Sequence, residues 1–74
     1  MSEYKYEKKE GQIEGTVIEA LPETTFKVLL DDESEIIAYL AGKMKIRRIR
    51  VLVGDRVLMT TDPYGGKARI FRRL

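Results

Sequence analysis

Five short segments in which apolar and polar residues alternate give the strongest structural signal in the sequence. Alternation with a period of two is typical of a strand with one buried face. The expected strands are residues 12–21, 25–31, 35–40, 56–61 and 67–72. Seventy-four residues make one domain at most, with a small core. The pattern therefore predicts an all-β domain of five short strands.

Turn residues separate these segments. Pro22 sets the backbone for the first corner of one turn, and Gly54-Asp55 makes another. The turn at 31–34 contains no glycine, so any positive φ there must fall on another residue. Gly15, in the middle of the first strand, indicates a bulge or a sharp coil of the kind that a small barrel needs to close.

A short basic segment, residues 42–50, interrupts the strand pattern between the third and fourth strands. It is too short for a full helix, but one or two helical turns fit. Its apolar residues, Met44, Ile46 and Ile49, can pin the segment down while the cations point outward. It has no acidic residue and holds five of the fourteen basic ones: Lys43, Lys45, Arg47, Arg48 and Arg50. Such a segment suits the binding of a polyanion; a solvated basic loop is the simpler alternative.

Five strands with a helical insertion after the third predict an OB-fold, a five-stranded Greek-key barrel that binds oligonucleotides. A small SH3-like barrel is the main competitor, because it also has five strands. It lacks a substantial insertion at this point of the chain. Residues 1–10 alternate in charge without an apolar period, so we expect a disordered N-terminal tail followed by one RNA-binding domain at 11–74.

The composition argues against catalysis. The chain has neither cysteine nor histidine, so it lacks the commonest metal ligands and the commonest general base. The acidic residues near 31–35 lack the spacing of a calcium loop, and a solvated turn is the simpler interpretation. We expect no enzyme activity, no cofactor and no metal. No apolar run approaches the roughly 20 residues that span a membrane, and we expect a cytoplasmic monomer.

Charge is strongly segregated behind a net value of +2. Residues 11–35 hold seven acids and one base, whereas residues 43–50 hold five bases and no acid. A second basic segment ends the sequence, with no acid and four bases: Lys67, Arg69, Arg72 and Arg73. This asymmetry predicts one cationic face and an anionic partner.

The aromatic residues limit the kind of nucleic acid. Only Tyr39, Tyr64 and Phe71 lie near the basic segments, and Phe26 is expected in the core. A nonspecific RNA chaperone of the cold-shock kind, the alternative function, has a dense aromatic run on its second and third strands that this chain lacks. We therefore expect phosphate and sugar contacts on a folded RNA, with one or two stacked bases. A protein-binding adaptor, a third interpretation, would need an exposed apolar patch that is not obvious here.

From about residue 13 to 72 the chain resembles bacterial translation initiation factor one. The resemblance lies in the combination and spacing of six short motifs, with Ala38 preceding the third. They are Gly15-Thr16-Val17 ending in Leu21-Pro22, Phe26-Lys27-Val28, Gly42-Lys43-Met44-Lys45, Ile49-Arg50, Gly54-Asp55 and Pro63-Tyr64.

The resemblance implies a non-enzymatic OB-fold factor that binds the small ribosomal subunit at the A site, over the decoding region of its RNA. It also implies cooperation with the second and third initiation factors. In the family the RNA contacts come from the Gly-Lys-Met-basic loop and the basic last strand. In this sequence the candidate RNA-binding residues are Lys43, Met44, Lys45, Arg47, Arg48, Arg50, Lys67, Arg69 and Arg72, with Tyr39 and Tyr64 as aromatic candidates.

The chain departs from the family pattern at several positions. Ile46 replaces a cation, and Arg48 replaces a frequent aromatic, so stacking there would use a guanidinium plane. Glu33 replaces a hairpin glycine, and Tyr39 stands where some members have histidine.

Overall fold

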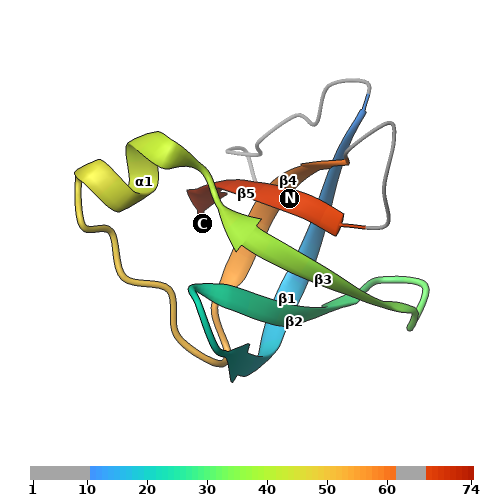
Figure 1. Ribbon diagram of the computed structural model, residues 1–74. Helices are drawn as coiled ribbons and strands as arrows, with labels where there is room; N and C mark the ends of the chain where they lie inside the picture. Colours follow the sequence, from blue (N-terminus) through green and yellow to red (C-terminus); the bar gives the residue numbers. More distant parts are fainter. Residues whose placement is uncertain (1–10, 62–66) are drawn as a thin grey trace.

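Five strands and one short helix form the part of the chain that the computed structural model describes, residues 11–61 and 67–74 (Figure 1). All five predicted strands are confirmed, with one end shifted by a single residue in two of them. The elements are β1 Gln12–Leu21, β2 Thr25–Leu30, β3 Glu35–Leu40, α1 Gly42–Ile46, β4 Arg56–Thr61 and β5 Lys67–Arg73. The predictions for the tail at 1–10 and for Tyr64 lie outside the described residues.

The strands close into a barrel in the order β1-β2-β3-β5-β4, with β4 pairing back onto β1. Neighbouring strands are antiparallel except β3 and β5, which run parallel. The all-β, five-stranded barrel with a helical turn between the third and fourth strands is thus confirmed. No helix in the described ranges is long and apolar enough to cross a bilayer.

Gly15 is required by a close approach of strands. A Cβ built on it would lie 2.6 Å from Val28 Cγ1 and 2.7 Å from the carbonyl oxygen of Leu29. The bulge itself falls further along β1, between Val17 and Glu19. Its position explains why Val17 is buried and Glu19 exposed although the two residues are two apart.

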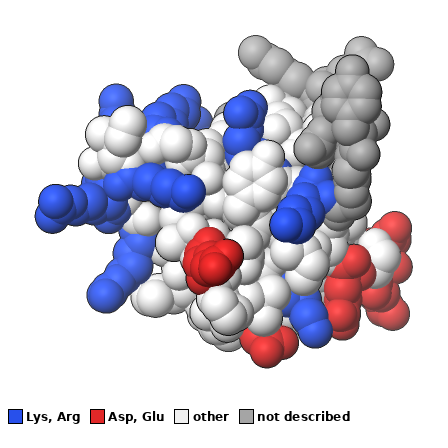
Figure 2. Space-filling view, viewed as in Figure 1, with Lys and Arg blue, Asp and Glu red and all other residues white. Residues whose placement is uncertain are grey.

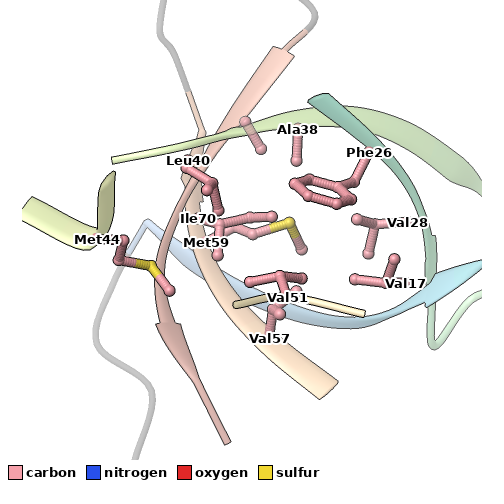
Figure 3. Close-up of a cluster of buried hydrophobic side chains, with 11 residues drawn as sticks. Val17, Phe26, Val28, Ala38, Leu40, Met44, Val51, Val57, Met59 and Ile70 are labelled. Carbon is pink, nitrogen blue, oxygen red and sulfur yellow. The ribbon is translucent and has the colours of Figure 1, made fainter. Parts of the chain in front are cut away.

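The barrel interior is filled by inward-facing apolar side chains from all five strands (Figure 3). Phe26 is 8% exposed, which confirms its expected place in the core. Val51, in the segment between α1 and β4, is also buried, whereas Leu52 and Val53 beside it are exposed. The core cluster comprises Val17, Phe26, Val28, Ala38, Leu40, Met44, Val51, Val57, Met59, Ala68 and Ile70.

The β2–β3 turn has its positive φ on Glu33, at 71°, so the predicted use of a residue other than glycine is confirmed. Asp32 Oδ1 supports the turn by accepting bonds from Ser34 Oγ at 2.6 Å and from Ser34 N at 3.0 Å. Because these donors favour the ionised carboxylate, they lower the pKa of Asp32 below its usual 3.8. Among the described residues, the acids here form no group that could hold a metal ion.

A charged network joins this acidic end of the barrel to β1 and β4. Arg56 Nη2 lies 2.6 Å from Glu14 Oε2, while its Nη1 donates to Thr16 Oγ1 at 3.0 Å and to Asp31 Oδ1 at 3.3 Å. The hydrogen bond to Glu14 is the main reason that the pKa of Arg56 is raised. This arginine is therefore committed to structure, unlike the cations described next.

Candidate nucleic-acid interface

The basic segment owes its shape to the way α1 ends. Two backbone hydrogen bonds reverse the chain direction at the end of α1. Arg48 N donates to Lys45 O at 3.1 Å, and Ile49 N donates to Met44 O at 3.0 Å. Arg48, between them, has a φ of 57°. This is the bonding of a Schellman motif, in which the left-handed position is usually glycine. In this chain the left-handed position is occupied by Arg48, which has a guanidinium side chain.

Two apolar residues anchor α1 to the barrel. Met44 is 1% exposed, and Ile49 is half-buried and packs against the core. The expectation that Ile46 also pins the segment is wrong, because this residue is 82% exposed. Met44 also has to leave the set of predicted contact residues: it is buried, so its side chain supports the surface from below.

Two hollows flank α1, and Met44 and Ile49 line both. The first, of about 310 Å³, lies between α1 and the end of β5; its other lining residues are Lys43, Arg47, Phe71, Arg72 and Arg73. The second lies on the other flank; its other lining residues are Thr24, Leu40, Lys45, Arg48 and Arg50. Helix α1 is thus a ridge with a cationic hollow on each side.

The last strand contributes Arg72 and Arg73 to the first hollow and two further cations to the outer face of the barrel. Ala68 and Ile70 point inward and are fully buried, so Lys67 and Arg69 face outward and are exposed. Arg73 connects the two basic segments directly, because its Nη1 donates to the backbone oxygen of Arg50 at 3.2 Å.

Tyr39, a predicted aromatic contact, lies on the outer face of the barrel beside Arg69, its register partner on β5. It is half-buried and lines neither hollow.

Seven cations of the two basic segments have no acidic partner in the described part of the chain. Figure 2 shows Lys and Arg side chains gathered around α1 and Asp and Glu side chains gathered near the β2–β3 turn. Within residues 11–61 and 67–74, the ion pairs formed by Lys27 and Arg56 involve Glu14, Glu19, Asp31 and Glu35. No carboxylate of the described ranges lies within 4.0 Å of the charged atoms of Lys43, Lys45, Arg47, Arg48, Arg50, Lys67 or Arg69. Unpaired charge of one sign on one face attracts polyanions.

Sequence reasoning missed two residues of the first hollow, Phe71 and Arg73. Strict alternation along β5 would place Phe71 with Lys67 and Arg69 on the outer face. The pairing of β4 with β5 shifts register between Leu58 and Met59, and this shift leaves Phe71 without a register partner on β4. No glycine marks the irregularity, so the sequence offered no sign of it.

The barrel and this surface define a class: an OB-fold protein whose cationic face is suited to a polyanion. The sequence model of the family described as translation initiation factor 1A / IF-1 matches residues 1–74. The translation initiation factor IF-1 of Rhodospirillum rubrum is 52% identical over 63 residues, and that of Azorhizobium caulinodans is 53% identical over 53 residues. The chain belongs to the translation initiation factor 1A / IF-1 family.

The aligned regions cover 84% and 72% of this chain, but 66% and 58% of those two relatives, so the chain spans about three-fifths of their length. Solved structures agree on the fold. The corresponding initiation factor of the Wolbachia endosymbiont of Brugia malayi has a TM-score of 0.73 at 44% identity, covering 85% of this chain and 76% of that one. YjeQ from Thermotoga maritima has a TM-score of 0.70 at 26% identity, covering 85% of this chain and 22% of that one.

Proposed function

We propose that this protein acts in translation initiation by binding RNA of the small ribosomal subunit at the A site, over the decoding region. In this proposal it works in the cytoplasm as a monomer, together with the second and third initiation factors, and binds without catalysing a reaction. Family membership supports the role in initiation. The cationic ridge supports RNA as the partner.

The observation that carries the proposal is the convergence of two basic segments on one surface. Residues 43–50 and 67–73 are separated by β4, yet they meet at the first hollow and through the bond from Arg73 to Arg50. The proposed phosphate and sugar contacts are Lys43, Lys45, Arg47, Arg48, Arg50, Lys67, Arg69 and Arg72. Tyr39 beside Arg69 and Phe71 in the first hollow offer aromatic faces, and Tyr64 stays a predicted contact.

Electrostatic attraction supplies most of the affinity in this proposal, and shape supplies the site. Phosphate contacts alone carry no sequence information. A convex ridge with a hollow on each side fits a folded RNA surface better than a single strand, because folded RNA is recognised mainly by shape and backbone.

Sedimentation with isolated ribosomal subunits tests the proposal. The protein should pellet with the small subunit and stay in the supernatant with the large one. Chemical probing should show protection of a few nucleotides of the decoding region, and an aminoglycoside that binds the A site should compete. Protection scattered over both subunits, or melting of unrelated RNA hairpins, would favour a nonspecific RNA chaperone instead.

A matched pair of variants tests the surface. Arg69→Gln removes an exposed cation without a described acidic partner, so it should weaken binding to the small subunit. Lys27→Gln removes a cation that is already paired with Glu19 at 3.5 Å and Glu35 at 3.9 Å. Binding by the Lys27 variant should equal that of the unaltered protein.

A further inference from the structure

Ile46 is the most exposed of the large apolar residues in the described part of the chain. The residue is 82% exposed, compared with 61% for Val53 and 54% for Leu52. It is the last residue of α1 and lies between Lys45 and Arg47, which line opposite hollows. An apolar side chain therefore projects into solvent from the ridge between the two cationic hollows, although it lines neither of them.

Within residues 11–61 and 67–74, the structure shows no supporting role for the Ile46 side chain. The apolar contact that accompanies a Schellman motif is made by Met44 and Ile49. A β-branched residue is also a weaker helix former than the straight-chain residues that could stand there. The described structure thus leaves this side chain in water although nothing about α1 requires an isoleucine.

We infer that Ile46 is an apolar contact to RNA, packing against a ribose or base face when the flanking cations bind phosphates. The inference rests on the proposed function. Charge complementarity selects this occupant over a second copy of the chain, because a symmetric contact at Ile46 would bring two sets of unpaired cations together. In proteins that bind the minor groove of DNA, apolar side chains also contact bases beside Arg and Lys, there by inserting between base steps.

The salt dependence of binding to the small subunit separates this contact from the charges. Apolar burial releases no counterions, so Ile46→Ala should lower the binding constant by about 10-fold at every salt concentration, without changing the slope of log K against log salt. Lys45→Ala should instead make the slope shallower by about 0.9. The control is Val53→Ala, an exposed apolar residue in the segment before β4, which should leave binding unchanged.

Ile46→Lys gives a second measurement with a different signature. The added cation should make the slope steeper by about 0.9, while binding extrapolated to about 1 M salt should fall as it does for Ile46→Ala. Because the side chain is exposed, neither variant should unfold, and circular dichroism checks this point.

Each outcome has one meaning. Binding that is unchanged by Ile46→Ala but reduced by Lys45→Ala and Arg69→Gln overturns the inference and leaves the proposed function intact. A slope that changes with Ile46→Ala also overturns the inference. If neither Lys45→Ala nor Arg69→Gln weakens binding, the proposed function itself is overturned. Equal binding to both ribosomal subunits would overturn it as well.

Discussion

The main-chain N–H of Ile49 donates to the carbonyl oxygen of Met44 across 3.0 Å, and this bond folds the end of α1 back onto its own buried anchor. The residue enclosed by the turn is Arg48, in a left-handed conformation with a φ of 57°. A residue with a Cβ is disfavoured there by roughly 1–2 kcal/mol. The backbone of Arg48 is therefore locally strained, and its guanidinium lies at the edge of the second hollow.

Replacing Arg48 by glycine should separate stability from binding. Arg48→Gly relieves the strain but gains flexibility in the unfolded state, so we expect a net stabilisation of about 0.5 kcal/mol, or about 3 °C in melting temperature. Binding to the small subunit should weaken, because one cation is lost. Thermal unfolding followed by circular dichroism and the sedimentation assay measure the two effects.

The control for this experiment is Arg48→Ala, which removes the same cation and keeps the strained conformation. It should weaken binding as much as Arg48→Gly does, without the gain in melting temperature. A glycine variant less stable than the alanine variant would contradict the strain at this position. An alanine variant less stable than the unaltered protein would show that the Arg48 side chain supports the turn.

Binding should depend steeply on salt. If six to nine cations of the two basic segments neutralise phosphates, the slope of log K against log salt should be on the order of −5 to −8. Titration of the small subunit at several potassium chloride concentrations gives this slope. A value near −1 would mean that the cationic ridge is not the contact surface.

Gly15→Ala should destabilise the barrel strongly. The new Cβ would lie 2.6 Å from Val28 Cγ1 and 2.7 Å from Leu29 O, and the backbone oxygen cannot move without disturbing the β1–β2 pairing. Overpacking of this kind costs about 1–3 kcal/mol, which corresponds to a fall in melting temperature of about 5–20 °C. Gly42→Ala is the matched control: a Cβ there meets nothing within 4 Å. Equal melting temperatures for the two variants would contradict the structural explanation.

Asp32 should titrate below its usual pKa of 3.8, because Ser34 donates to its carboxylate from both Oγ and N. Since the folded pKa is the lower one, the stabilisation from this carboxylate is complete above 3.8 and is lost as the pH falls through the folded value. Carbon-detected NMR titration of the carboxyl group measures the pKa. In Ser34→Ala, which removes the larger of the two causes, the pKa should rise toward 3.8, and a pKa that does not move would contradict this assignment.

The strands were predictable because half-buried strands impose alternation on the sequence, and the positive φ at Glu33 followed from a turn without glycine. The positive φ values of Glu23 and Thr24, at 64° and 55°, were not predicted. Pro22 predicted an ordinary turn, and neither Glu23 nor Thr24 is a residue that favours a positive φ.

The positive charge of the ridge could be predicted from the sequence, but its shape could not. The apolar residues of the segment at 42–50 are spaced two and three apart, which fits no single face of a helix, so their spacing could not show that Ile46 points away from the barrel. The residue at which α1 ends could not be predicted either, because Arg48 occupies the left-handed position where a glycine usually signals the end of a helix. Which cations share the first hollow depends on the position of β5 beside β3, a long-range contact that leaves no trace in local sequence.

The parallel pairing of β3 with β5 has a consequence for how the protein is made. β5 pairs with both β3 and β4, so a polypeptide that has been synthesised only as far as β4 has two free sheet edges and an open core. Free edges are sites of aggregation. The same unfinished chain also lacks the far wall of the first hollow. The addition of β5 therefore closes the barrel and completes the first hollow in one event, so a half-made chain does not carry the complete cationic surface.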